Sequence, residues 1–290
     1  MIRLTALILG SSLVLVGCGT PSAPPNITLV KPEVVTPVAS TVTSANTTND
    51  TSNAQPKAPT ESGPPLATTP IKMTVTGDNC RDGRCGKLTV ISVAFPEFKD
   101  FSTFIDISLS TMASIDSNTV PPYRGLKSLS EFFKETAAPR SEVLLEAQVL
   151  RNSPTIVVMA LKSYIYIGGA NGLSSTQYLN WLPNFNRLAG LQTILLPERM
   201  TQFMAALKQQ HEVWLTQQRD AIGNLEQFKA QWPFKPSDNV ALLSNGLEVS
   251  YEPFTIAPKS FGEPKITIPY EQLIGILRPE YILIALGLKN

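Results

Sequence analysis

The stretch GLEVSYEPFTIAPKSFGEPKITIPY, residues 246–270, contains two short segments in which apolar and polar residues alternate. Leu247 and Val249 point to one side of the first segment if it is extended, and Ile266 and Ile268 do so in the second, because successive side chains of a strand alternate between its faces. The stretch therefore predicts two paired strands with one apolar face turned inward. It contains no His and no Cys, and nothing in it indicates catalysis.

The residues before this stretch predict an α+β fold, with an antiparallel sheet packed against helices. A long helix is predicted near 198–221, because apolar residues recur there at helical spacing and Pro197 suits the first turn. Alternating or continuous apolar runs predict further strands at 87–98, 143–149, 155–167, 177–187 and 239–243, and helices at 101–115 and 129–136. Pro183 indicates that the strand at 177–187 lies at an edge or contains a bulge.

The first 17 residues have the pattern of a signal peptide. Arg3 precedes an apolar run, Leu4–Val16, that is too short to span a bilayer as a finished helix. The ending Leu-Val-Gly-Cys18 resembles the bacterial lipobox, and this resemblance implies a lipoprotein cut before Cys18 and acylated there. Gly19, where inner-membrane retention signals have Asp, favours an outer-membrane lipoprotein facing the periplasm, with surface exposure as an alternative. An ordinary secretory signal with an unmodified cysteine is the other interpretation.

Residues 18–77 differ in composition from the rest of the chain. Ten of the 24 prolines lie here, among Thr, Ser, Asn and Ala, and no apolar period persists. Such a segment buries too little apolar surface to offset its ordering entropy, so we expect a disordered tether with a root-mean-square span of about 40 Å. It would either let the domain search the envelope or act as a simple spacer.

Charge and size limit the function of the remaining residues, 78–290. The chain has 24 Lys and Arg against 23 Asp and Glu, and loss of Arg3 with the signal peptide leaves no net charge. This balance gives no electrostatic basis for binding nucleic acid. The length suffices for one domain with a proper core, for which two lobes, 78–190 and 191–290, are an option. No oligomeric state follows from the sequence.

The cysteines and the single histidine do not indicate a metal or cofactor site. Cys80 and Cys85 flank the turn dipeptide Asp-Gly, so we predict a disulfide in an oxidising compartment. Zinc would need two further soft ligands, and the domain offers no other cysteine and a single His, so we expect neither metal nor cofactor. His211 lies on the apolar face of the long helix, which favours a packed, hydrogen-bonded role over general-base catalysis.

Two motifs resemble the RsiV-type domain, an extracellular module shared by an anti-sigma factor and a peptidoglycan deacetylase. The first is the opening stretch, with its glycines, prolines and aromatic residues between Gly246 and Leu273. The second is the run Tyr-Ile-Gly-Gly-Ala-Asn at 166–171, which resembles a strand-end turn of the family with Asn171 where His is usual. The resemblance covers residues 85–290. It does not extend to sigma-factor binding or deacetylation, because the corresponding segments have no counterpart in this sequence.

This resemblance implies a binding module for a cell-wall-related partner, either a lysozyme-like protein or peptidoglycan. Glycine amides could hold a sugar oxygen and aromatic rings could stack on sugars, although a positive φ and packing within strands explain the same residues. The candidate ligand-binding residues are Tyr166, Gly168, Gly169, Asn171, Tyr178 and Trp181, with Tyr164 as a further aromatic residue. A hydrolase acting on peptidoglycan or its fragments is the alternative, although the sequence contains no G-x-S-x-G, H-E-x-x-H or P-loop pattern.

Overall fold

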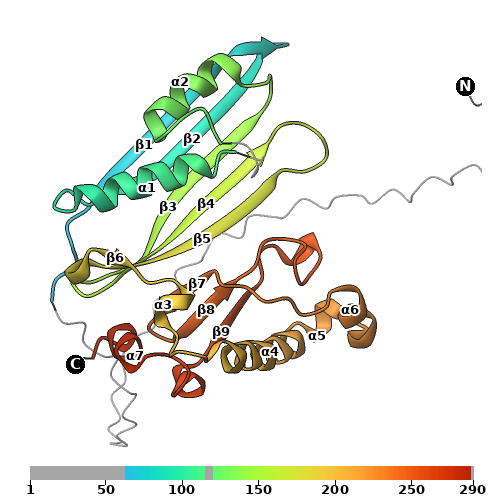
Figure 1. The fold of residues 1–290 in the computed structure, drawn as a ribbon. Coiled ribbons are helices and arrows are strands. Elements are labelled where there is room, and N and C mark those ends of the chain that lie inside the picture. The colour runs from blue at the N-terminus through green and yellow to red at the C-terminus, as the bar shows by residue number, and fades with distance from the viewer. Residues whose placement is uncertain (1–62, 115–119, 289–290) are drawn as a thin grey trace, which may run out of the picture. The chain divides into compact units, whose positions relative to one another are not determined.

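The computed structural model describes residues 63–114 and 120–288 (Figure 1). These residues all lie in one compact unit of the chain. The signal peptide, Cys18 and most of the proposed tether lie outside the described residues, so their assignments stay predictions. Within the described ranges, no helix combines the length and apolarity that crossing a bilayer requires.

The larger of two sheets has six strands, arranged in chain order from one edge to the other. Its strands are β1 (Thr69–Arg81), β2 (Arg84–Ala94), β3 (Glu142–Asn152), β4 (Val157–Tyr166), β5 (Leu173–Leu182) and β6 (Arg187–Leu188). Neighbours are antiparallel except β2 and β3, which are parallel. A parallel pair needs a crossover, and α1 (Lys99–Thr111) and α2 (Leu126–Thr136) lie within it. The sequence-based α+β fold class is confirmed.

Strand β4 explains why the sheet supports two apolar cores. Val157, Met159 and Leu161 join the core beneath α1 and α2, whereas Val158 and Ala160 join the core on the opposite face. Because both faces are covered, the strand is a continuous apolar run instead of an alternating one. Figure 1 shows α1 and α2 on one side of this sheet, and the smaller sheet and α4 on the other.

The smaller sheet contains the stretch from which the fold was first inferred. Its strands are β7 (Val240–Leu243), β8 (Gly246–Ser250) and β9 (Lys265–Ile268), in that order. Leu247 lies opposite Ile268 and Val249 opposite Ile266, and all four are buried, so the pairing predicted for these strands is confirmed. The long helix α4 (Met200–Gln217) packs on β9.

Short helices complete the second half of the chain. They are α3 (Leu191–Ile194), α5 (Arg219–Ile222), α6 (Leu225–Gln231) and α7 (Pro279–Leu286), with single 3-10 turns at Lys259–Phe261 and Tyr270–Leu273. The carbonyl end of α7 is held by Arg151 of β3, whose guanidinium donates to the backbone oxygens of Ala285 at 2.5 Å and Ile284 at 3.1 Å. A cation at the carboxyl end of a helix donates to carbonyls that lack a partner within the helix, and it interacts favourably with the helix dipole.

The structure corrects the boundary placed at residue 77 between tether and domain. Strand β1 begins at Thr69, so the last residues assigned to the tether belong to the sheet. Met73 lies opposite Val90 and Val75 opposite Leu88, and both side chains pack against the core beneath the helices. The prolines around this segment gave it the composition of a disordered tether, so the alternation was not recognised as a strand in the sequence. Pro70 is tolerated because β1 is an edge strand.

Several other element boundaries differ by a few residues from the sequence-based prediction, and two of them change the elements themselves. The strand expected at 177–187 begins earlier and ends at Leu182, because Pro183 opens a 3-10 helix, Pro183–Phe185, before the two-residue strand β6. The helix expected over 198–221 is divided, with α4 ending at Gln217 and α5 following as a separate turn.

Candidate functional site

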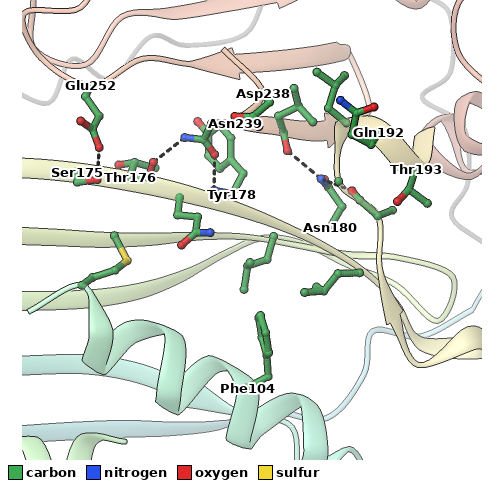
Figure 2. A pocket seen from close by; sticks show the side chains of 18 residues that line it. Phe104, Ser175, Thr176, Tyr178, Asn180, Gln192, Thr193, Asp238, Asn239 and Glu252 are labelled. Carbon is green, nitrogen blue, oxygen red and sulfur yellow. Dashed lines mark hydrogen bonds between the residues drawn. The ribbon is translucent and has the colours of Figure 1, made fainter. Parts of the chain in front are cut away.

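A cavity of about 570 Å³ lies beside β5 (Figure 2). We call it the β5 groove, together with a neighbouring cavity of about 380 Å³ that shares Met112, Ser175 and Glu252 with it. Residues of α1, β5, the segment 188–193 and the start of β7 line the first cavity, and residues 252–254 with Lys259 line the second.

The groove exists because β5 has a largely open edge. Along its length β5 pairs with β4, but on its other side β6 covers only Trp181 and Leu182. In an antiparallel strand every second residue turns both its N–H and its C=O to the same side. The even-numbered residues of β5 present these groups at the open edge, since the Asn180 carbonyl accepts from Ala189 N at 2.7 Å.

Two asparagines connect this edge to the smaller sheet. Asn239 accepts from Tyr178 N at 2.8 Å and donates to the Thr176 carbonyl at 2.6 Å, so its amide takes the place of a neighbouring strand. In return, Asn180 of β5 donates to the Val240 carbonyl at 2.8 Å and accepts from Leu242 N at 2.7 Å. Figure 2 shows Asn239 above Thr176 and Tyr178, and Asn180 further along the strand. These contacts fix the position of β7 relative to β5.

The groove combines apolar walls with a polar rim. Phe104, which is 40% exposed, and Met112 form the wall contributed by α1, and Phe254 lines the far end. The charged side chains that line the larger cavity are Asp238 and Glu252. Glu252 accepts a hydrogen bond from Ser175 Oγ at 2.9 Å. In Figure 2 this pair lies at one end of the groove, while Gln192 and Thr193 lie at the other.

Three of the predicted binding residues lie on the connection between β4 and β5, and a fourth, Tyr166, is the last residue of β4. Gly168, Gly169 and Asn171 are exposed, and Tyr166, partly buried, donates its hydroxyl to the Gly169 carbonyl at 3.1 Å. Gly168 and Gly169 have φ values of 114° and 96°, which side-chain-bearing residues rarely adopt, so the turn itself accounts for both glycines. The loop leads directly into Gly172, which lines the end of the groove.

The other two predicted binding residues, Tyr178 and Trp181, are buried, which rules out stacking on a sugar in this structure. Trp181 is 2% exposed and its ring stacks on Phe101 at 4.0 Å between centroids. Tyr178 is 7% exposed and donates its hydroxyl to Glu248 of β8. Burial and this hydrogen bond raise the pKa of Tyr178 well above its ordinary value. Both aromatic residues pack because β5 is covered on its two faces.

Sequence reasoning missed Phe104, Asn180, Asp238, Asn239 and Glu252. Asn180 gave one usable signal, since it is an amide inside an apolar strand and a buried amide requires partners. Phe104 flanks the helix face that buries Phe101, Ile105 and Leu109, so periodicity groups it with the core and gives no sign of a groove. The remaining residues come from a distant part of the chain, and only the fold brings them to β5.

Cys80, Cys85 and His211 form no catalytic constellation within the described part of the chain. Cys80 and Cys85 are joined by a disulfide across the end of the β1–β2 hairpin. His211 is packed, 2% exposed and stacked on Trp214, but neither ring nitrogen has a hydrogen-bond partner among the residues that the structure describes, which corrects the hydrogen-bonded role predicted for it. Among the described residues, no three His, Cys, Asp or Glu side chains are grouped as metal ligands would be.

Comparison with known proteins places part of the groove within a recognised domain. Residues 192–271 match DUF3298, a family described as a protein of unknown function. The DUF3298 match includes Asp238, Asn239 and Glu252, whereas β5 and α1 precede it. No curated protein shows a significant similarity to the chain.

Solved structures extend the similarity beyond the DUF3298 match. A DUF3298 family protein from Pseudomonas aeruginosa PAO1 has 25% sequence identity and a TM-score of 0.69, over 75% of this chain and 97% of that one. A member of the family from Bacteroides fragilis has 17% identity and a TM-score of 0.58, over 76% of this chain and 97% of that one, and this likeness concerns the fold alone. The finer RsiV-type assignment stays a prediction.

Proposed function

We propose that this chain is a lipid-anchored binding module of the bacterial envelope and that the β5 groove is its ligand site. The main support for this proposal is the groove itself, in which apolar walls lie next to amide, hydroxyl and carboxylate groups held by strands and a helix. Cavities of this size and composition are the usual form of binding sites. The lipobox-like sequence ending at Cys18 supports the envelope location, and the RsiV-type motifs support a lysozyme-like protein or peptidoglycan as the partner.

Removal of one groove wall tests the site. The variant Phe104→Ala deletes an aromatic ring that lines the groove, and Ile107→Ala is its matched control, because Ile107 lies on the same helix, is 42% exposed and does not line the groove. We expect wild type and the Ile107 variant to be retained by purified sacculi or by immobilised lysozyme. The Phe104 variant should bind about ten-fold more weakly, the usual cost of losing an aromatic anchor. Equal retention of both variants would exclude the groove.

Peptidoglycan hydrolysis is the second candidate function, because two carboxylates, Asp238 and Glu252, line the same cavity. Glycoside hydrolysis requires a pair of carboxyl groups that flank the scissile bond. Incubation of the protein with sacculi distinguishes the two functions. A binding module leaves no soluble muropeptides, whereas an enzyme releases them at a rate that Asp238→Asn and Glu252→Gln lower. Release by wild type but not by these variants would replace binding with catalysis as the function.

The lipid anchor is tested separately from the groove. Acylation requires the thiol of Cys18, so Cys18→Ser should move the protein from the membrane fraction to the soluble fraction of the envelope. Several acyl chains are needed for durable attachment, so partial lipidation should give intermediate fractionation. An unchanged membrane fraction would contradict the anchor and leave the groove experiment unaffected.

A further inference from the structure

We propose that a cavity on the exposed face of β3, β4 and β5 binds a neutral saccharide, with the ring of Tyr164 as the platform on which a sugar ring stacks. This inference does not rest on the function proposed for the β5 groove, because it assigns a second ligand surface and its chemical class. The cavity measures about 350 Å³. Ligand pockets range from about 300 to about 1,000 Å³, so this one suits a small ligand or a short stretch of a polymer.

Two rows of side chains across the larger sheet form the floor of the cavity. Residues directly opposite each other in neighbouring strands share one face of a sheet. One row is Leu144, Tyr164 and Ser174, and the next is Glu146, Lys162 and Thr176. Intervening residues such as Leu145 and Ile165 belong to the core beneath α1 and α2, so both rows face the other way. The β5 groove, which Ile165 helps to line, lies on the opposite face.

The smaller sheet ends this floor on one side and gives the cavity its wall. The same face of β4 and β5 continues into Ala160 and Tyr178, which pack in the core with the smaller sheet. Where this cover begins, Glu263 and Lys265 line the cavity, just before and at the start of β9. Thr176 donates its hydroxyl to Glu263 at 2.5 Å. The cavity is therefore a corner between the exposed part of the larger sheet and a polar wall.

Tyr164 is exposed at this corner, and Gly172 makes room for its ring. Tyr164 is 38% exposed. A Cβ atom at position 172 would lie 2.4 Å from two ring carbons of Tyr164, and Gly172 does not have a positive φ. Space for the ring, and not the backbone conformation, therefore accounts for the glycine. A ring held in this way can stack on the apolar C–H face of a pyranose, whose edge bears the hydroxyl groups.

The charges around Tyr164 balance, which favours a neutral ligand rich in hydroxyl groups. The charged side chains that line the cavity are two carboxylates and two ammonium groups, those of Glu146, Glu263, Lys162 and Lys265. Lys162 lies 3.8 Å from Glu146, and Lys265 lies 3.5 Å from Glu248. Because each lysine is already beside a carboxylate, an ionic ligand of either sign gains little. Carboxylates accept and ammonium groups donate hydrogen bonds, so together they can hold neighbouring hydroxyl groups of a sugar.

The test measures binding of chitotetraose, a neutral oligosaccharide of N-acetylglucosamine, to the full chain by isothermal titration calorimetry. Tyr164→Ala removes the platform, and Tyr164→Phe is the matched control, because it keeps the ring and loses only the hydroxyl. We expect the Ala variant to bind at least about ten-fold more weakly than wild type, and the Phe variant to stay within about three-fold. Gly172→Ala should also weaken binding, since its Cβ displaces the ring.

Equal affinity of wild type and Tyr164→Ala, at unchanged thermal midpoints, would overturn the inference. If the Ala variant does not fold, nuclear Overhauser contacts between the Tyr164 ring and the sugar C–H protons in wild type replace it. Absence of these contacts at saturating chitotetraose has the same meaning.

Salt and the type of sugar test the chemistry of the ligand. Raising the ionic strength from about 0.05 M to about 0.5 M strongly screens exposed charges, so the affinity of a neutral ligand should change by less than about two-fold. A larger loss would overturn the assignment to a neutral ligand. Cellotetraose lacks the acetamido groups of chitotetraose. Weaker binding of cellotetraose would assign the site to amino-sugar glycans such as those of peptidoglycan, and equal binding would assign it to neutral glycans in general.

Phe104→Ala separates this site from the β5 groove. It should leave chitotetraose binding unchanged, because Phe104 lines the groove on the other face of the sheet. If sacculi or lysozyme retain the protein through Phe104 but wild type binds neither tetrasaccharide, the function proposed for the groove stands and the saccharide site is wrong. If chitotetraose binding needs Tyr164 and no ligand needs Phe104, the saccharide site stands and the groove is wrong. Weaker chitotetraose binding in Phe104→Ala but not in Tyr164→Ala would place the saccharide in the groove and overturn the inference.

Discussion

Asn180 is the residue whose replacement should most disturb the connection between the two sheets. Its side chain is 3% exposed and makes three hydrogen bonds, to the Ala189 carbonyl at 3.1 Å, the Val240 carbonyl at 2.8 Å and Leu242 N at 2.7 Å. Each bond contributes about 1 kcal/mol to stability, and leaving a buried group unpaired costs about 1–3 kcal/mol. We therefore expect Asn180→Ala to lower the free energy of unfolding by about 3–5 kcal/mol.

This loss is large compared with the total stability of a typical domain, about 5–15 kcal/mol. Urea denaturation of the full chain measures it, provided that the slope of the transition is unchanged. Asn239→Ala is the comparison, because Asn239 makes two such bonds to β5 but is only half-buried, so water can reach the freed groups. Its cost should be about 1–2 kcal/mol. A cost below about 1 kcal/mol for Asn180→Ala would refute the claim that these asparagines hold β7 against β5.

Three further predictions concern buried ionisable groups. Burial lowers the pKa of His211, so the folded state favours the neutral ring. The free energy of unfolding should therefore be complete above about pH 6.5, the ordinary pKa of His, and fall below it by up to about 1.4 kcal/mol per pH unit. In urea denaturation between about pH 7.5 and about pH 5, His211→Phe should remove this fall. Arg151→Met should cost about 1.5–3 kcal/mol in the same assay, because two carbonyls of α7 lose a charged donor, whereas Arg140→Met, which breaks only an exposed ion pair, should cost less than about 1 kcal/mol. Burial raises the pKa of Tyr178, Tyr251 and Tyr270. Their contribution to the free energy of unfolding should be complete below about pH 10 and fall above it, because these residues ionise in the unfolded chain first. Their phenolate absorbance should therefore appear together with unfolding.

Each of these predictions has a contradicting result. An acid dependence that persists in the His211 variant would assign it to other groups. Equal costs for the two arginine variants would mean that Arg151 does not stabilise α7. If replacing Tyr178, Tyr251 or Tyr270 by Phe reduced the phenolate absorbance that the folded protein shows near about pH 10, that hydroxyl would be accessible to water.

Sequence patterns predicted strands with one buried face from alternation, and β4, which is buried on both faces, from its continuous apolar run. The pairing of β8 with β9 followed from alternation alone, because Leu247, Val249, Ile266 and Ile268 all turn to one core. Strand β1 was missed although it alternates too, since the surrounding prolines made the composition resemble that of a tether. There the local composition indicated a disordered segment, whereas the alternation of side chains indicated a strand. The structure has a strand, because this segment pairs with β2.

The candidate site was much less predictable than the fold. The strand-end turn predicted at Gly168 and Gly169 does follow β4, and it leads into one end of the groove. Tyr178 and Trp181 were misjudged because periodicity shows which residues share a face and not whether a second layer covers that face. The groove depends on hydrogen bonds from Asn180 to β7 and between Asn239 and β5. The partners of such long-range hydrogen bonds cannot be predicted from a single sequence.

Hydrogen–deuterium exchange of the full chain, with and without lysozyme or soluble peptidoglycan fragments, tests the central claim most directly. Amide exchange reports burial and hydrogen bonding of each backbone segment. If the β5 groove is the ligand site, one of these ligands should slow exchange at residues 173–179 and 238–240 and leave the far edge of the sheet, β1, unchanged. Protection at β1 or α2 with none along β5 would contradict the account.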